Sequence, residues 1–304
     1  MSSYGCTCYP YGPRIHNDAI PTMPSDSSHP AFPASIAFIG GGNMARSLIG
    51  GLIRGGAPAS AICVAEPNAQ LREALTRDFA VATHADNALA TRNADVWVLA
   101  VKPQVTREVC RGLRDAAQAR QPLVVSIAAG IRIAQLEKWL DCATAIVRCM
   151  PNTPALMGAG ASGLCANAHT SPAQREQAQS ILAAAGLVEW IDQEALMDTV
   201  TALSGSGPAY FFLLVEALEN AAVAQGLPRA TARALAAQTC LGAGRMLGEG
   251  DVAAAELRRR VTSPGGTTQA ALESFSADRF DEIVARAVAE ATRRGNELSA
   301  QLDD

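Results

Sequence analysis

From Ser35 onward, short apolar runs alternate with longer stretches in which apolar residues recur every three or four positions. The short runs have the length and β-branched content of buried strands, and the longer stretches have the period of amphipathic helices. The predicted strands are Ile36–Ile39, Ala61–Ala65, Val81–Thr83, Val96–Val101, Leu123–Ile127 and Ala145–Arg148. The predicted helices between them are Asn43–Arg54, Asn68–Asp78, Asp86–Arg92, Val105–Ala119 and Ile133–Leu140. This alternation favours a parallel sheet wound with helices.

The pattern changes after Asp192. Before that point, two apolar runs at Gly163–Ala166 and Val188–Ile191 flank a predicted helix at Ala173–Ala185 and would extend the sheet. Beyond it, only helices are predicted: Glu194–Leu203, Ala209–Gln225, Ala230–Leu247, Val252–Val261, Thr267–Phe275 and Asp278–Leu302. The fold class is therefore α/β, with an N-terminal sheet domain over residues 35–192 and an all-helical domain over residues 193–304.

The helix predicted at Ala209–Gln225 is apolar on nearly every side, broken only by Glu216, Glu219 and Asn220. A helix of this kind must be buried on most of its surface, and one small helical domain offers little to cover it. We therefore expect a homodimer formed through the helical domain.

Residues 1–34 hold six prolines and no apolar periodicity, which predicts a disordered extension. The segment lacks the continuous apolar stretch of a signal peptide and the Arg-rich amphipathic pattern of a transit peptide. No apolar run approaches the roughly 20 residues of a membrane span. A cytoplasmic protein without a membrane partner is the expectation.

The composition of the chain argues against some classes of function. The chain has 304 residues, of which 49% are hydrophobic and 18% charged, as in ordinary globular enzymes. A net charge of −4 and 5% aromatic residues give no basis for binding nucleic acid. The eight cysteines include no CxxC pair, and six lie inside apolar runs, so buried thiols and no metal site are expected.

The segment IAFIGGGNMA runs from a predicted strand through Gly40, Gly41 and Gly42 into a helix that starts at Asn43. Glycines at this place permit a tight turn and let the backbone approach a pyrophosphate at the helix N-terminus. Gly40 and Gly42 fit the first two glycines of the GxGxxG pattern, and Ala45 fits the third. A Rossmann-type dinucleotide site is predicted, with a purely structural turn as the alternative.

The next strand ends at Glu66, where Rossmann proteins place the residue that faces the adenosine ribose. A carboxylate there can accept hydrogen bonds from both ribose hydroxyls and would repel a 2′-phosphate, which favours NADH. The next basic residue, Arg72, lies more than a helical turn away. The alternative is a solvated strand-end carboxylate without a ligand.

Two later strand ends carry residues suited to line a cofactor. Lys102 follows the strand VWVLAV, and the small residues Ala128, Ala129 and Gly130 follow VVSI, which leaves room for nicotinamide and ribose. Simple packing is the alternative for these positions.

In the helical half, Ser263 to Thr268 read SPGGTT before a helix. The exposed first-turn amides of such a helix can hold a carboxylate, and an ordinary helix cap is the competing interpretation. The stretch from Ser204 to Pro208, SGSGP, is a similar helix start, either as a cap with close helix packing or as a pocket lining.

Taken in order, FIGGGNMA, AVKPQ, VVSIAAG, MPNTPA, LSGSGPAY and VTSPGGTT make the chain similar to the pyrroline-5-carboxylate reductase family over residues 35–302. The resemblance implies a Rossmann domain followed by a helical dimerisation domain, dimers that assemble further into decamers, and hydride transfer from NADPH or NADH to Δ1-pyrroline-5-carboxylate, giving L-proline. It places dinucleotide contacts on Ile39, Gly40, Gly41, Gly42, Asn43, Met44, Asn87, Ala100, Val101, Lys102, Pro103, Ala128, Ala129 and Gly130. It places substrate contacts on Ser263, Thr267 and Thr268, to which we add Gly266, and Thr268 is our candidate catalytic residue.

One position departs from the family, whose members usually carry Lys-Asp where this chain has Arg258-Arg259. The helical half also contains no lysine and no histidine. A 3-hydroxyacid dehydrogenase of the 6-phosphogluconate type would need a lysine there as base, whereas a protonated cyclic imine already carries its proton and needs mainly orientation. A dinucleotide-binding protein without catalytic activity is the remaining alternative.

Overall fold

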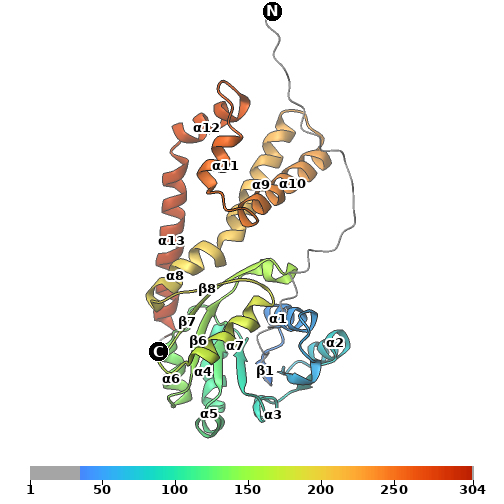
Figure 1. Cartoon of the computed structure of the whole chain (residues 1–304), viewed down its shortest axis with the longest axis vertical. Coiled ribbons are helices and arrows are strands. Elements are labelled where there is room, and N and C mark those ends of the chain that lie inside the picture. Colours follow the sequence, from blue (N-terminus) through green and yellow to red (C-terminus); the bar gives the residue numbers. More distant parts are fainter. Residues whose placement is uncertain (1–34, 303–304) are drawn as a thin grey trace, which may run out of the picture. The chain divides into compact units, whose positions relative to one another are not determined.

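The computed structural model describes residues 35–302; the predicted extension 1–34 and positions 303–304 lie outside them. The described residues form one eight-stranded sheet in the order β3-β2-β1-β4-β5-β6-β7-β8 (Figure 1). The strands are β1 Ile36–Ile39, β2 Ile62–Ala65, β3 Ala82–His84, β4 Val96–Leu99, β5 Leu123–Ser126, β6 Ile146–Met150, β7 Gly160–Ala166 and β8 Gly186–Trp190.

The strands from β1 to β6 pair in parallel, whereas β7 runs antiparallel to β6 and β8 runs parallel to β7. In the register, Ile36 pairs with Ile62 on one side and Val96 on the other. The order 3-2-1-4-5-6 is that of a Rossmann sheet, in which the order of the strands along the chain reverses between β1 and β4. Ligands bind at the carboxyl ends of the strands beside that reversal.

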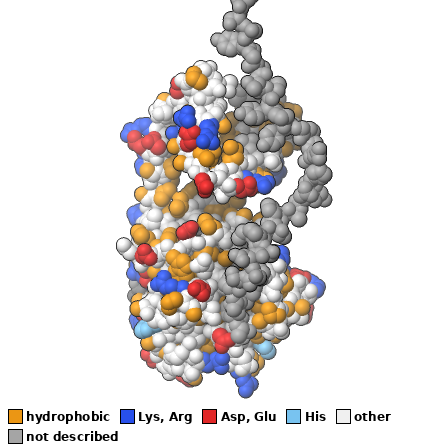
Figure 2. Space-filling model, viewed as in Figure 1, with side chains coloured by type: hydrophobic (Ala, Val, Ile, Leu, Met, Phe, Trp, Pro, Cys, Tyr) orange, Lys and Arg blue, Asp and Glu red, His pale blue; other side chains and the backbone are white. Residues whose placement is uncertain are grey.

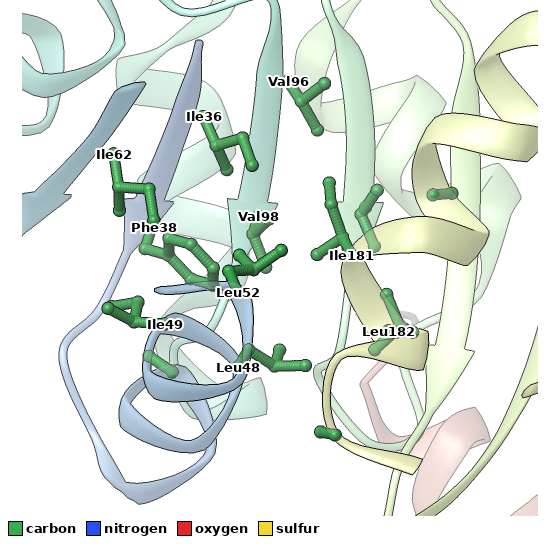
Figure 3. Packing of buried hydrophobic residues seen from close by; sticks show 14 of the residues in the cluster. Ile36, Phe38, Leu48, Ile49, Leu52, Ile62, Val96, Val98, Ile181 and Leu182 are labelled. Carbon is green, nitrogen blue, oxygen red and sulfur yellow. The ribbon is translucent and has the colours of Figure 1, made fainter. Parts of the chain in front are cut away.

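Helices join the strands at α1 Asn43–Arg54, α2 Ala69–Phe79, α3 Asn87–Thr91, α4 Pro103–Gly112, α5 Arg114–Arg120, α6 Ile133–Leu140 and α7 Pro172–Ala183. Alternate strand residues face opposite sides, so the sheet has a core on each face. One core joins Ile36 and Phe38 to side chains of α1 and α7 (Figure 3). The other joins Ile39 and Trp97 to side chains of α4 and α6.

After β8, the described residues form only helices and turns, as the sequence predicts, and the predicted fold class is confirmed. A 3₁₀ turn at Glu194–Leu196 leads into α8 Met197–Val200, and a π turn at Thr201–Gly205 leads into α9 Gly207–Ala224. The later helices are α10 Arg229–Gly248, α11 Ala254–Arg260, α12 Thr267–Ala277 and α13 Phe280–Gln301.

Two predicted helices were wrong in extent. The helix expected at Val105–Ala119 is two helices, because the backbone leaves helical geometry at Leu113, whose side chain is buried in the core. The helix expected at Glu194–Leu203 is divided into 3₁₀, α and π turns. Periodicity cannot register such breaks, because the same apolar side chains remain buried across them.

A buried ion-pair network connects β6 with the start of the helical half. The Arg148 guanidinium lies 3.1 Å from the Glu194 carboxylate and 3.4 Å from the Asp198 carboxylate. Glu194 also accepts a hydrogen bond from the Ile133 amide at the start of α6. The network therefore fixes α8 against both the sheet and α6.

Helix α9 leaves large apolar side chains exposed in the single chain. Phe211, Phe212 and Leu213 are 59%, 69% and 65% exposed. The surface of the helical region carries further hydrophobic side chains between small groups of arginines and acidic residues (Figure 2). No helix among residues 35–302 is long and apolar enough to cross a membrane.

Candidate active site

The predicted dinucleotide contacts gather at the carboxyl edge of the sheet. Hydrogen bonds join neighbouring strand ends: the Gly40 amide donates to the Ala65 carbonyl oxygen, and the Ala100 amide to the Ile39 carbonyl oxygen, both at 2.8 Å. Because β1, β2, β4 and β5 are adjacent and parallel, the residues that follow them share one edge. This edge of the sheet carries Ile39, Gly40, Glu66 and Ala100, together with the residue that follows each of them.

The three glycines of the turn have different structural roles. Gly40 has φ +102°, and a Cβ there would lie 2.5 Å from the Ala100 carbonyl oxygen, so the fold itself requires glycine. A Cβ on Gly41 would lie 2.7 Å from Leu75 Cδ1. A Cβ on Gly42 would meet nothing within 4 Å. The fold therefore leaves a space at Gly42 that a side chain would fill.

That space lies at the N-terminus of α1. Gly42 is the N-cap residue without a side-chain hydrogen bond, and the first intrahelical bond runs from the Arg46 amide to the Gly42 carbonyl oxygen. The amides of Asn43 and Met44 therefore precede the helical ladder, and no acidic residue lies in the first turn. An open space with helix N-terminal amides fits a pyrophosphate group.

Glu66 is buried rather than solvated. One carboxylate oxygen accepts a hydrogen bond from the Gly41 amide and the other from the Asn68 amide, each at 2.9 Å. The interpretation of Glu66 as a solvated strand-end carboxylate is wrong, because the side chain folds back onto the glycine turn.

Arg72 lies closer to this edge than its sequence position indicates. Its Nη1 donates to the carbonyl oxygens of Glu66 and Pro67, both at 2.8 Å. Its distance from Glu66 along the sequence gives no indication of this contact. Because Arg72 lies one helical turn into α2, its long side chain can reach the carbonyl oxygens just before that helix.

The remaining predicted cofactor residues flank the turn. Lys102 is exposed and precedes Pro103, the first residue of α4, while Val101 is partly buried. Asn87 begins α3 and is partly exposed. The side chains of Lys102 and Asn87 present polar atoms at the edge, whereas Val101 packs against the core.

The turn after β5 has a structural neighbour that the sequence did not reveal. Ala128 is buried and Ala129 is exposed, while Gly130 has φ +76°. A Cβ on Gly130 would lie 3.5 Å from both Ser299 Oγ and Leu302 Cδ1 at the end of α13. The C-terminal helix therefore reaches the carboxyl edge.

The SPGGTT turn precedes α12. Gly266 is the N-cap and makes no side-chain hydrogen bond, and the first helical bond runs from the Ala270 amide to the Gly266 carbonyl oxygen. Within residues 35–302, the hydroxyls of Ser263, Thr267 and Thr268 make no hydrogen bond, so none of them caps the helix. The turn presents free hydroxyls and first-turn amides, a combination suited to a carboxylate.

The two candidate ligand regions are not joined in the single chain. Among the described residues, no hydrogen bond or ion pair links the SPGGTT turn with the glycine turn. Helix α12 packs against α13.

The arginines that depart from the family pattern differ in their surroundings. Arg259 forms a two-pronged ion pair with Glu256, which Arg260 also contacts, and these pairs lower the pKa of the Glu256 carboxyl. Arg258 lines a hollow of about 670 Å³ together with Thr262 and residues of α9, α12 and α13.

The LSGSGPAY segment forms the π turn and the start of α9. The Asn152 side chain donates to the Ser204 carbonyl oxygen at 3.0 Å and accepts from the Ala161 amide at 2.9 Å. A Cβ on Gly205 would lie 2.6 Å from Met150 Cε. Close packing against Met150 therefore accounts for the glycine at position 205. The hydrogen bonds of Asn152 connect the MPNTPA segment with the LSGSGPAY segment.

Two cysteines of the described part of the chain are poorly suited to act as nucleophiles. Cys110 and Cys149 are buried, and burial raises the pKa of the Cys110 thiol to about 12 and that of the Cys149 thiol further. Within residues 35–302, no group of three or more His, Cys, Asp or Glu side chains could hold a metal ion.

A Rossmann sheet with an open glycine turn, followed by a helical domain, defines the class of two-domain nicotinamide-dinucleotide oxidoreductases. A Pseudomonas aeruginosa pyrroline-5-carboxylate reductase is 53% identical over 267 residues, covering 88% of this chain and 97% of that protein. The chain belongs to the pyrroline-5-carboxylate reductase family.

Other comparisons agree with this family assignment. Residues 194–298 match the family model "Pyrroline-5-carboxylate reductase dimerisation", and residues 35–130 match "NADP oxidoreductase coenzyme F420-dependent". A solved pyrroline-5-carboxylate reductase from Coxiella burnetii has 44% identity and a TM-score of 0.85, with 88% of this chain and 98% of that chain covered. The Plasmodium falciparum enzyme, solved with NADP bound, has 28% identity and a TM-score of 0.76 over 88% of this chain and 98% of that chain.

Proposed function

We propose that the protein is a pyrroline-5-carboxylate reductase, which reduces the ring C=N bond of Δ1-pyrroline-5-carboxylate and produces L-proline. The observation that carries this proposal is the 53% identity to the Pseudomonas aeruginosa reductase across nearly its whole length. A bound NADPH or NADH supplies the hydride.

The chain's own contribution begins with holding the dinucleotide. The pyrophosphate would lie at the open Gly42 position, against the amides of Asn43 and Met44. The nicotinamide end of the dinucleotide site would be lined by Lys102, Pro103 and Ala129. Asn87 would lie at the outer border of the same site. The free space at Gly42 and the uncapped start of α1 support this assignment.

The substrate would bind at the SPGGTT turn. Ser263 and the first-turn amides, including that of Thr267, would hold its carboxylate, with Gly266 leaving the backbone accessible. The Thr268 hydroxyl would hydrogen-bond the ring nitrogen. The uncommitted hydroxyls of all three residues support this arrangement.

Orientation accounts for the absence of a general base. The imine nitrogen of the protonated substrate carries its proton already, so the carbon that accepts hydride is electrophilic without further proton transfer. Holding the imine carbon, which becomes C5 of proline, against C4 of the nicotinamide contributes several kcal/mol. The absence of lysine and histidine from residues 193–304 counts against an alcohol dehydrogenase, which needs a base.

The protein would act as a homodimer, with decamers as a further level of assembly. The exposed apolar side chains of α9 and the match to the dimerisation family model support a dimer. The dimer would also bring the SPGGTT turn of one protomer to the glycine turn of the other, which are not joined within one chain. The cytoplasmic location expected from the sequence remains a prediction.

Turnover tests this function. Purified protein should consume NADPH or NADH only when pyrroline-5-carboxylate is present, with one L-proline formed per cofactor oxidised. Tight cofactor binding with no proline formed would favour the binding protein without catalytic activity.

A further inference from the structure

The last turn of α13 carries a buried hydroxyl group without a partner. Ser299 is fully buried, and within residues 35–302 its Oγ makes no hydrogen bond. Thr292, two turns earlier on the same helix, donates to the Val288 carbonyl oxygen at 3.0 Å, as hydroxyls in helices commonly do. Because a buried donor without an acceptor is destabilising, native structures contain few of them. The role of Ser299 therefore lies outside its own helix.

The Ser299 hydroxyl faces the turn that follows β5. A Cβ on Gly130 would lie 3.5 Å from Ser299 Oγ and 3.8 Å from the Ser299 amide nitrogen. Leu302 Cδ1 would lie 3.5 Å from the same Cβ, and this side chain packs against the core that includes Ala128. The end of α13 therefore lies directly against the Ala128–Gly130 turn.

The same end of α13 is fixed to the sheet domain. A Cβ on Gly295 would lie 3.4 Å from Asp198 Cβ, and the Asp198 carboxylate belongs to the buried network around Arg148. Gly295 and Ser299 are four residues apart, so they lie on one face of the helix. Close packing against Asp198 therefore holds the Ser299 hydroxyl in place beside the turn.

The turn itself has unused hydrogen-bonding groups and an adaptable backbone. Within the described part of the chain, the amides and carbonyl oxygens of Ala129 and Gly130 make no hydrogen bond. Gly130 has φ +76°, and a glycine can exchange this conformation for one with negative φ at little steric cost. Rotation of a peptide group in this turn can therefore direct a carbonyl oxygen at Ser299 without displacing α13.

We propose that Ser299 is a positioning residue for the nicotinamide: when the dinucleotide binds, the Ala128–Gly130 turn adjusts, and the carbonyl oxygen of Ala129 or Gly130 accepts a hydrogen bond from the Ser299 hydroxyl. Because this bond forms only in the bound state, it strengthens cofactor binding and does not stabilise the free protein. The proposal rests on the proposed function only in that the chain binds a nicotinamide dinucleotide against this turn.

Pairs of ligands that differ only in the nicotinamide test this role. NADPH is compared with 2′-phospho-ADP-ribose, and NADH with ADP-ribose, by calorimetry without pyrroline-5-carboxylate. Ser299→Ala should weaken binding of both dinucleotides about three- to tenfold, the equivalent of one hydrogen bond, and binding of both fragments less than twofold. Thr292→Val removes a hydroxyl that is bonded within α13, and this matched control should leave all four constants within twofold.

Equal losses for dinucleotide and fragment in Ser299→Ala, or no loss for either, would overturn the role of Ser299 alone. A wild-type protein that binds neither dinucleotide would overturn the proposed function, and this inference with it.

Hydrogen–deuterium exchange provides a second measurement that needs no variant. In the wild-type protein, NADPH should slow amide exchange both in the Ala128–Gly130 turn and in the last turn of α13, whereas 2′-phospho-ADP-ribose should leave α13 unchanged. Unchanged exchange at the end of α13 with NADPH would contradict the proposal.

Thermal unfolding without ligand separates positioning from ordinary packing. Ser299→Ala should melt at the wild-type temperature or above it, because the substitution removes a buried hydroxyl without a partner. A lower melting temperature together with unchanged dinucleotide affinity would show that the hydroxyl only stabilises the fold, against the proposal.

Discussion

At the residue scale, Gly40 and Gly42 have different roles. The fold requires glycine at position 40, whereas glycine at position 42 leaves space for the dinucleotide. Gly42→Val should fold, because the added side chain meets nothing within 4 Å, but it should weaken dinucleotide binding at least tenfold by filling the pyrophosphate space. Calorimetric titration with NADPH measures the loss.

Gly40→Ala is the matched control. Its left-handed backbone and the 2.5 Å approach of a Cβ to the Ala100 carbonyl oxygen should destabilise the protein by about 2 kcal/mol or more in chemical denaturation. Unchanged cofactor affinity in a folded Gly42→Val protein would remove this turn from the site.

Thr268 is the second residue on which the account depends. Thr268→Ala should lower kcat/KM for pyrroline-5-carboxylate by about one to two orders of magnitude, because a positioned hydrogen bond to the reacting group is lost. Thr268→Ser should recover much of the activity. Steady-state kinetics measures kcat/KM, and direct titration should give an almost unchanged Kd for the dinucleotide. A wild-type rate in the alanine variant would show that this hydroxyl takes no part.

At the element scale, the Arg148 network should stabilise the attachment of α8 to the sheet. Arg148→Met leaves the Asp198 carboxylate buried without a cation, which should destabilise the protein by about 3 kcal/mol in urea denaturation. Adding Asp198→Asn should recover part of that loss.

Arg293→Met gives the comparison for this prediction. Arg293 pairs with Glu290 and Glu297 on the exposed face of α13, and its loss should leave the free energy of unfolding almost unchanged, because solvent screens exposed ion pairs. Equal effects of the two methionine substitutions would show that the buried network has no special role.

The elements also show what the sequence can predict. The helices at Asn43–Arg54 and Ile133–Leu140 were predicted to the residue, because apolar period and end signals agree there. The break at Leu113 and the π turn at Thr201–Gly205 could not be predicted, since both preserve the buried pattern while changing the backbone.

The candidate site, too, could be predicted from the sequence only in part. Motifs identify the glycine turn and the SPGGTT turn, because short-range spacing encodes a turn before a helix. The commitment of Glu66 to Gly41, the return of Arg72 over its loop and the contact of α13 with Gly130 depend on tertiary packing. A sequence pattern carries no signal for such contacts.

At the scale of the whole molecule, the apolar surface of α9 makes self-association the central expectation. Light scattering at micromolar concentration should give the mass of a dimer or a multiple of it. Phe212→Arg, at a side chain that is 69% exposed in the single chain, should shift the protein toward monomer and reduce activity.

Leu187→Arg is the control, because Leu187 on β8 is 62% exposed but lies outside the helical region. It should leave the mass unchanged. A stable, active wild-type monomer would refute the interface.

The most direct test of the account follows the transferred hydrogen. The protein is incubated with pyrroline-5-carboxylate and NADPH that carries deuterium at the transferred position of C4, and the product is analysed by mass spectrometry and NMR. L-Proline with one deuterium at C5 is the expected product. Unlabelled proline, or oxidation of the cofactor without formation of proline, would contradict it.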